Sequence, residues 1–159
     1  MTAPLTLGEI LLMKGRLTQR ALDEALAEQK RSGEFLGSIL LRRRSIQEAD
    51  LAEAFSEQFG MPCLRLKNHY IDWSLVDRFP PSLVLDCQCF PLRSDGYKII
   101  FAVSNPLNAE GMAKALEGVG ALKVEFVLTL PTDMGELLDR YRREVRARIR
   151  RSLNENKET

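Results

Sequence analysis

The sequence has little of the chemistry that enzymes need. Its 159 residues include a single histidine, and no motif for a phosphate-binding loop, a dinucleotide-binding turn, a zinc protease or a serine nucleophile occurs in it. His69 would need a nucleophile or a paired carboxylate beside it to act as a general base, and the sequence places neither there. We therefore expect no catalytic residue and no enzymatic activity.

Cysteines are also few. Cys63, Cys87 and Cys89 make an odd number, which argues against a disulfide framework. Cys87 and Cys89 have one residue between them, whereas zinc-binding pairs usually have at least two. We expect reduced, partly buried thiols, no metal and no cofactor.

Long apolar runs and an excess of one charge are absent as well. No stretch approaches the roughly 20 apolar residues needed to span a bilayer, and the first residues lack the features of a signal peptide. The 23 lysines and arginines nearly balance the 22 aspartates and glutamates. We therefore expect a cytoplasmic protein, with no membrane insertion and no DNA partner.

What the sequence does contain is a unit that occurs twice. Residues 7–29 read LGEILLMKGRLTQRALDEALAEQ, and residues 36–58 read LGSILLRRRSIQEADLAEAFSEQ. A repeated unit of this size usually cannot bury its apolar face alone, so we expect the two copies to pack as a pseudo-symmetric pair. The pair could form a groove for a two-fold symmetric ligand, or it could be a helical hairpin that only packs on itself.

Each copy reads as two short helices. In the first copy, Thr6 and Glu9 have the spacing of a capping box, which predicts a helix start at Thr6. Gly15 can end that helix because glycine tolerates positive φ, and a second helix begins near Thr18. Its apolar residues Ala21, Leu22, Ala25 and Leu26 lie on one face.

The second copy repeats this pattern with one departure. Ser45 and Glu48 again have capping-box spacing, but Arg44 stands where the first copy has Gly15. A side chain is strained at positive φ. Either the second turn has another backbone, or Arg44 was gained for a contact.

After Gly60 the sequence changes to short strands and helices. Apolar, β-branched or alternating runs predict strands near 62–66, 90–93, 97–103 and 124–128. Asp95-Gly96 is a hairpin turn signal, and a helix from 109 to about 117, closed by Val119-Gly120, predicts a parallel crossover to the last strand. Brief helices are expected at 73–79 and 82–86.

The chain ends in a basic helix. Asp133 and Glu136 have capping-box spacing, which predicts a start at Thr132 or Asp133. Seven arginines lie between residues 140 and 151. Such a helix can lead into a linker as a solvated rod, or it can bind an acidic partner, lipid head groups or nucleic acid.

These patterns predict an α+β fold with three parts. Residues 1–60 form a subdomain of two repeated helical hairpins, with copies at 6–29 and 35–58. Residues 61–142 form a small α/β subdomain with a sheet of three or four strands, and residues 143–159 form a basic tail or linker.

The doubled motif followed by a small α/β part resembles the N-terminal domain of type II secretion (GspE) and type IV pilus assembly ATPases, in its MshEN form. The resemblance runs from Leu7 to about Tyr141. Some members of that family bind cyclic di-GMP, and the domain also occurs joined to glycosyltransferases and other output modules. The resemblance therefore implies a non-enzymatic regulatory module with cyclic di-GMP as a possible ligand.

The resemblance also assigns binding roles. In the nucleotide-binding members, the backbone of the leucine-glycine pairs meets the ligand, later apolar residues wall its bases, and a glutamine closes each motif. In this sequence these positions are Leu7, Gly8, Leu36 and Gly37, then Leu22, Leu26, Leu51 and Phe55, and finally Gln29 and Gln58. Helix N-termini attract phosphates and flat apolar surfaces suit purines, although each apolar residue equally fits a core.

Three positions depart from the family pattern. Thr6 and Phe35 stand where the motif has arginines that contact guanine, and the nearest arginines, Arg31 and Arg44, lie elsewhere. Asn105 stands in the loop that often carries an aspartate, and an amide cannot replace the paired acceptors of a carboxylate. At roughly 1.5–3 kcal/mol for each charged hydrogen bond, these losses could weaken binding by several powers of ten. Phe35 could stack on a base instead.

The matching motif and its three departures together leave two hypotheses. The first is a sensor, in which the groove between the copies binds a cyclic dinucleotide. The second is a docking module that has lost its ligand and binds a secretion or pilus assembly protein, or a fused output domain.

Overall fold

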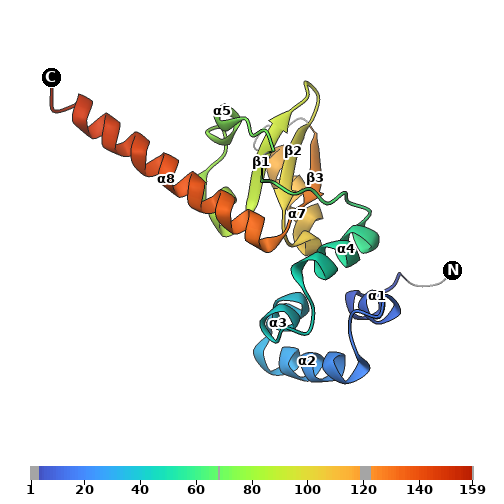
Figure 1. Ribbon diagram of the computed structural model, residues 1–159. Coiled ribbons are helices and arrows are strands. Elements are labelled where there is room, and N and C mark those ends of the chain that lie inside the picture. The colour runs from blue at the N-terminus through green and yellow to red at the C-terminus, as the bar shows by residue number, and fades with distance from the viewer. Residues whose placement is uncertain (1–3, 68, 119–122, 159) are drawn as a thin grey trace.

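The computed structural model describes residues 4–67, 69–118 and 123–158 and shows a helical unit beside a small sheet, with one long helix leading away (Figure 1). In chain order, its elements are α1 (Leu7–Met13), α2 (Gln19–Ser32), α3 (Leu36–Arg42), α4 (Glu48–Phe59), α5 (Trp73–Val76), α6 (Pro81–Asp86), β1 (Cys89–Ser94), β2 (Ile99–Val103), η1 (Pro106–Asn108), α7 (Ala109–Gly118), β3 (Val124–Leu128) and α8 (Pro131–Glu155). The predicted α+β fold, with four helices from the doubled unit followed by a sheet, is confirmed.

The two copies of the unit are interlocked. Helix α1 of the first copy packs against α4 of the second, and α2 packs against α3. Apolar residues of all four helices belong to one buried cluster. Neither hairpin therefore buries its apolar face alone, as the duplication predicts.

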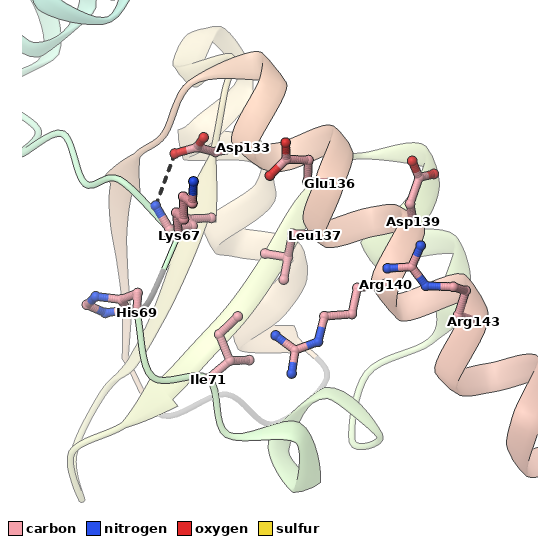
Figure 2. A pocket seen from close by; sticks show the side chains of 10 residues that line it. Lys67, His69, Ile71, Asp133, Glu136, Leu137, Asp139, Arg140 and Arg143 are labelled. Atoms are coloured by element: carbon pink, nitrogen blue, oxygen red, sulfur yellow. Dashed lines mark hydrogen bonds between the residues drawn. The ribbon is translucent and has the colours of Figure 1, made fainter.

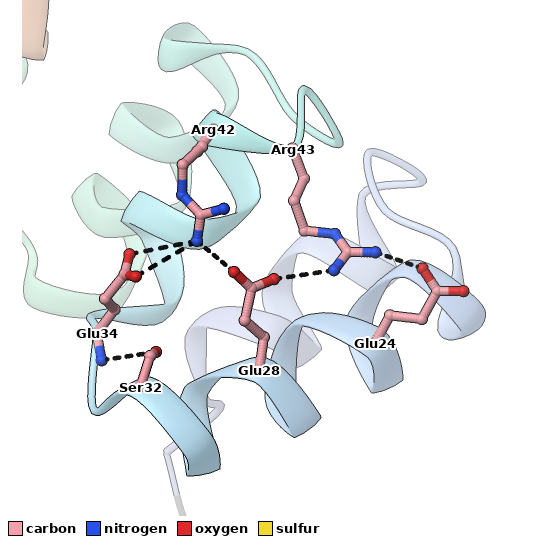
Figure 3. Close-up of polar contacts among 6 residues, drawn as sticks. All are labelled: Glu24, Glu28, Ser32, Glu34, Arg42 and Arg43. Carbon is pink, nitrogen blue, oxygen red and sulfur yellow. Dashed lines mark hydrogen bonds and ion pairs between the residues drawn. The ribbon is translucent and has the colours of Figure 1, made fainter.

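Ion pairs also join the two copies, at equivalent positions of each. The Nζ of Lys14 lies 3.0 Å from Glu53 and 2.6 Å from Glu57, on the other copy. At the equivalent positions, Arg43 lies 2.6 Å from Glu24 and 2.9 Å from Glu28. Figure 3 shows the second set, which Arg42 extends to Glu28 and Glu34.

The first copy has the predicted helix ends. The backbone N–H of Thr6 donates to the carboxylate of Glu9 at 2.7 Å, and the N–H of Glu9 donates to the Thr6 hydroxyl at 3.3 Å. Thr18 caps α2 with its side chain. Gly15 has a φ of 67°, so it ends α1 in the left-handed region as expected.

The second copy keeps the backbone but changes a cap. Arg44 has a φ of 57°, so its turn has the same left-handed conformation as the turn at Gly15. The predicted capping box of Ser45 and Glu48 is wrong, because α4 begins at Glu48 and the N–H of Gln47 donates to Asp50 at 2.9 Å. The carboxylate of Glu48 is engaged instead by α8.

The sheet has the order β1-β2-β3. Strand β1 pairs with β2 in antiparallel fashion across the Asp95-Gly96 turn, and β2 pairs with β3 in parallel after α7, as predicted. The strand expected near 62–66 is wrong, since that segment makes only one bridge, from Cys63 to Leu128. The predicted helix closure at Val119-Gly120 lies outside the described residues.

Strand β2 separates two apolar clusters. Ile99, Phe101 and Val103 face the cluster shared with the helical unit and α7. Ile100 and Ala102 face the cluster shared with α5, α6 and α8. A strand covered on both faces reads as a continuous apolar run, which is what residues 99–103 show.

Helix α8 is fixed at its start and leads away at its end. It begins at Pro131, so the predicted capping box of Asp133 and Glu136 is wrong. The Asp133 carboxylate instead accepts from the Arg65 guanidinium at 2.9 Å and from the Leu66 N–H at 3.1 Å. The C-terminal end of α8 runs away from the sheet (Figure 1).

A candidate site in the groove between the two repeats

A cavity of about 530 Å³ lies between the two copies. Both hairpins contribute to its lining, together with one residue from η1. Its lining residues are Thr6, Leu7, Gly8, Glu9, Leu22, Leu26 and Gln29 from the first copy, Phe35, Leu36, Phe55 and Gln58 from the second, and Leu107. Its volume falls within the range typical of small-molecule sites, and its walls are mostly apolar.

Most of the residues that the family resemblance assigns to a ligand line this cavity. Gly37 and Leu51 do not: the ring of Phe35 lies over Gly37, and Leu51, which lies beside Gly37, is buried. Asn105 lies in a neighbouring hollow, where its side chain accepts from the Leu107 N–H at 3.1 Å. Binding roles for all of these residues stay predictions.

Two lining residues are not predicted from the sequence. The spacing of Glu9 indicates only a helix cap, and it serves there. Leu107 is half-exposed on the loop that also carries Asn105, so an apolar residue beside the predicted loop contact is the signal that could have found it.

The polar groups of the cavity are partly unsatisfied. The side-chain amide of Gln29 donates to the backbone carbonyl of Glu34 at 3.2 Å. The side-chain oxygen of Gln58 is buried and accepts no hydrogen bond within the described part of the chain. An orphaned buried acceptor costs about 1–3 kcal/mol, and a ligand that donates to it would recover that cost.

A second hollow of about 500 Å³ lies between α8 and a segment that contributes Leu66, Lys67, His69 and Ile71 (Figure 2). Its charges are mixed, with Lys67, Arg140 and Arg143 beside Glu136 and Asp139. The guanidinium carbon Cζ of Arg140 lies over the ring of Trp73, 4.8 Å from its centroid.

The deepest acid of this hollow, Asp133, is already satisfied. Its two partners are Arg65 and the Leu66 N–H, and the guanidinium holds the pKa of Asp133 below its ordinary value. This arrangement ties residues 65–66 to α8. We therefore assign the second hollow a structural role.

The chemistry for catalysis or metal binding is weak over residues 4–67, 69–118 and 123–158. No group of three histidine, cysteine or acidic side chains that could hold a metal occurs there. Burial raises the pKa of the Cys89 thiol to about 12, which keeps it protonated and unreactive. In the same ranges, no helix is long and apolar enough to cross a membrane.

Comparisons with known proteins agree with the fold. The profile of the MshEN domain family matches residues 59–148, which cover the end of α4, the sheet layer and much of α8. The chain is 34% identical over 137 residues to the type IV pilus assembly ATPase PilB of Thermus thermophilus, covering 86% of this chain and 15% of that protein.

Two further relatives have similar coverage. The PilB of Myxococcus xanthus is 25% identical over 135 residues, which are 85% of this chain and 24% of the relative. The bacteriophage adsorption protein B of Escherichia coli K12 is 31% identical over 124 residues, which are 78% of this chain and 16% of the relative. The chain thus spans 15 to 24% of the length of these three proteins.

Solved structures show the same fold. The structure of MshE with cdg has a TM-score of 0.75 and 23% identity, and the match covers 86% of this chain and 99% of that one. The N-terminal domain of XpsE has a TM-score of 0.70 and 20% identity, with 84% and 92% covered.

Proposed function

This chain belongs to the MshEN domain family, and we propose that it is a non-enzymatic regulatory module that binds cyclic di-GMP in the groove between its two repeats. The observation that carries the proposal is the cavity of about 530 Å³, walled by residues at equivalent positions of both copies. A structural neighbour, MshE, was solved with cdg, the abbreviation of cyclic di-GMP. The proposal includes a cytoplasmic location and no catalytic step.

The groove has surfaces for a guanine base. Leu22, Leu26 and Phe55 offer apolar walls to the faces of a planar ring. The unpartnered oxygen of Gln58 can accept from the ring N–H or the amino group of guanine. Thr6 does not replace the arginine of the family motif, because its short side chain carries no charge and its hydroxyl oxygen already accepts from the Glu9 N–H. We therefore expect weak binding.

Calorimetric titration with cyclic di-GMP at near-physiological salt tests the proposal. Gly8→Trp places an indole in the groove, so its binding heat should be lost. Met13→Trp is the matched control, because it adds the same ring on α1 at a position that is 75% exposed and outside the groove. Absence of heat for the wild type at millimolar ligand, or equal binding by folded Gly8→Trp, would contradict the proposal.

The end of α8 favours docking as a second function. Ile149 and Leu153 are 56% and 58% exposed, and they continue the buried stripe of Leu138 and Tyr141 along the helix. Six arginines flank them between residues 142 and 151. We propose that this end contacts a secretion or pilus assembly protein or a fused output domain, and that residues 1–60, 61–142 and 143–159 are the functional parts.

Pull-down with the assembly components encoded beside this chain tests docking. Ile149→Asp with Leu153→Asp should abolish capture. The control pair Asp139→Lys and Glu144→Lys changes charge on the same helix without touching the apolar stripe, and should retain it. Docking would be excluded if no component is captured by the wild type.

A further inference from the structure

The two halves of the groove are not equally open. With one constant offset, Gly8 is equivalent to Gly37, Leu22 to Leu51, and Leu26 to Phe55. Gly8, Leu22 and Leu26 of the first copy all line the cavity, whereas of their three equivalents only Phe55 does; Phe35, Leu36 and Gln58 are the other lining residues of the second copy. The cavity therefore belongs mainly to the first half-site, although α1 and α3 begin and end at equivalent residues.

The ring of Phe35 causes this difference. A Cβ atom at Gly37 would lie 2.5 Å from Cε1 and 2.9 Å from Cζ of Phe35, and 3.0 Å from Cδ1 of Leu51. The ring therefore lies directly over the glycine. It also stacks on Phe55, with centroids 5.7 Å apart and planes 18° apart.

The equivalent residue of the first copy leaves its half open. Thr6 has a short side chain that is engaged in the capping box with Glu9. The three atoms nearest to a Cβ at Gly8 would all belong to Leu22, the first of them at 2.9 Å. Both Gly8 and Leu22 line the cavity.

We infer that Phe35 closes the second half-site, so that the groove holds one guanine of its ligand and not two. This inference rests on the proposed function. The protein's own phenyl ring takes the place of the second base between Gly37, Leu51 and Phe55. Gln58 lines the same cavity, and its unpartnered side-chain oxygen is the acceptor we assign to the single bound base.

A one-base groove has a specific ligand preference. The second base of cyclic di-GMP gains little contact, so a ligand with a single guanine should bind almost as well. Stacking of a base on an apolar protein surface is typically worth a tenfold or larger change in affinity. Removing the Phe35 ring should let the second base stack, and should therefore raise the affinity for cyclic di-GMP but not for a ligand with a single guanine.

Equilibrium titrations with GMP and cyclic di-GMP test this preference. For the wild type, we expect the two affinities to lie within about tenfold of each other. Phe35→Ala should tighten cyclic di-GMP by about tenfold or more and leave GMP unchanged. Phe59→Ala is the control, because Phe59 also packs against Phe55, with centroids 5.9 Å apart, but does not line the groove.

A strong preference for cyclic di-GMP over GMP would contradict the inference. If the wild type prefers cyclic di-GMP by about a hundredfold, and Phe35→Ala weakens it, the ring binds the second base and the inference is overturned.

A measurement without ligand separates this inference from the proposed function. In a background with Cys63→Ser and Cys87→Ser, a thiol is introduced by Leu22→Cys or Leu51→Cys and labelled with a maleimide. We expect the Leu22→Cys protein to react at least about tenfold faster, and Phe35→Ala to remove the difference by exposing position 51. Equal labelling of both would overturn the closed half-site even if nucleotide binds. Unequal labelling without any nucleotide binding would retain the closure and reject the ligand.

Discussion

The two copies of the repeat have equivalent first helices and equivalent left-handed turns, but they differ in what they pack against. The second copy is anchored to the rest of the molecule. Glu48 accepts from the N–H of Thr132 at 3.0 Å and from its hydroxyl at 2.7 Å, at the start of α8. At the equivalent position of the first copy, Gln19 only donates to Asp23 within its own helix.

Burial follows the same division. Both Phe55 and its equivalent Leu26 line the groove, but Phe55 is 1% exposed and Leu26 is 37% exposed. The comparison shows that duplication has preserved helix pairing and turn geometry, while side chains have diverged with whatever each copy packs against. The anchored copy has gained a closed core, and the free copy has kept an open face.

The largest expected difference between the copies concerns Phe55 and Leu26. Phe55→Ala removes a fully buried ring and should lower the free energy of unfolding by about 3–5 kcal/mol. Leu26→Ala removes a half-exposed side chain and should cost less than about 1 kcal/mol while weakening ligand binding. Urea unfolding measures both, and similar costs would show that the first copy is as closely packed as the second.

Acid should weaken the contact between residues 65–66 and the start of α8. Arg65 holds the pKa of Asp133 below the ordinary value of 3.8. A carboxylate with a lowered pKa contributes stability that is present above the ordinary value and is lost as pH falls through the folded-state pKa. Asp133→Asn should cost about 1–3 kcal/mol at neutral pH, since Asp133 is buried and bonded to the Leu66 N–H.

This cost should shrink as the wild type loses the same charge below about pH 3.8. Urea unfolding at neutral and acid pH measures how this cost in the free energy of unfolding changes with pH. Asp139→Asn, on an exposed position of the same helix, is the control and should leave the slope unchanged. A constant cost of Asp133→Asn at all pH values would contradict the role of its charge.

A smaller effect is expected where α4 meets α8. Glu48→Ala leaves the N–H of Thr132 without its acceptor, and losing such a cap typically costs about 0.5–2 kcal/mol. Hydrogen exchange at residues 130–134 should accelerate. Gln19→Ala, at the equivalent position of the free copy, should change stability by less than about 0.5 kcal/mol. If both variants behave alike, the second copy is not anchored through Glu48.

Prediction from the sequence succeeds where the signal is local. The repeat, the cap at Thr6, the turn at Gly15 and the hairpin at Asp95-Gly96 each depend on residues a few positions apart. It fails at Ser45 and Asp133 because the capping spacing is present but the carboxylates of Glu48 and Asp133 are engaged by partners 84 and 67 positions away. Long-range contacts override local propensity.

The candidate site shows the same limit. The family resemblance assigns Leu22, Leu26, Leu51 and Phe55 to one groove, and all of them except Leu51 line the cavity. It does not predict that Phe35 lies over Gly37, because the direction of that ring depends on its stacking against Phe55, twenty positions along the chain. The offset predicts equivalence, and packing then breaks it.

The smallest effects are expected at the two left-handed turns, where the comparison between copies is closest. Gly15 has a φ of 67° and Arg44 a φ of 57°. A side chain in this region costs about 1 kcal/mol relative to glycine. Because a Cβ at Gly15 would meet no atom within 4 Å, Gly15→Ala should lower the free energy of unfolding by about 1 kcal/mol through backbone strain alone.

Arg44→Gly should do the reverse and raise the free energy of unfolding by about 0.5 kcal/mol, since glycine relieves the strain but gains freedom in the unfolded chain. Thermal or urea unfolding of the two single variants measures whether each change raises or lowers the free energy of unfolding. A loss of stability in Arg44→Gly would mean that the arginine makes a contact worth more than the strain. Comparing Arg44→Asn, which tolerates the left-handed region, would then separate side-chain contact from backbone preference.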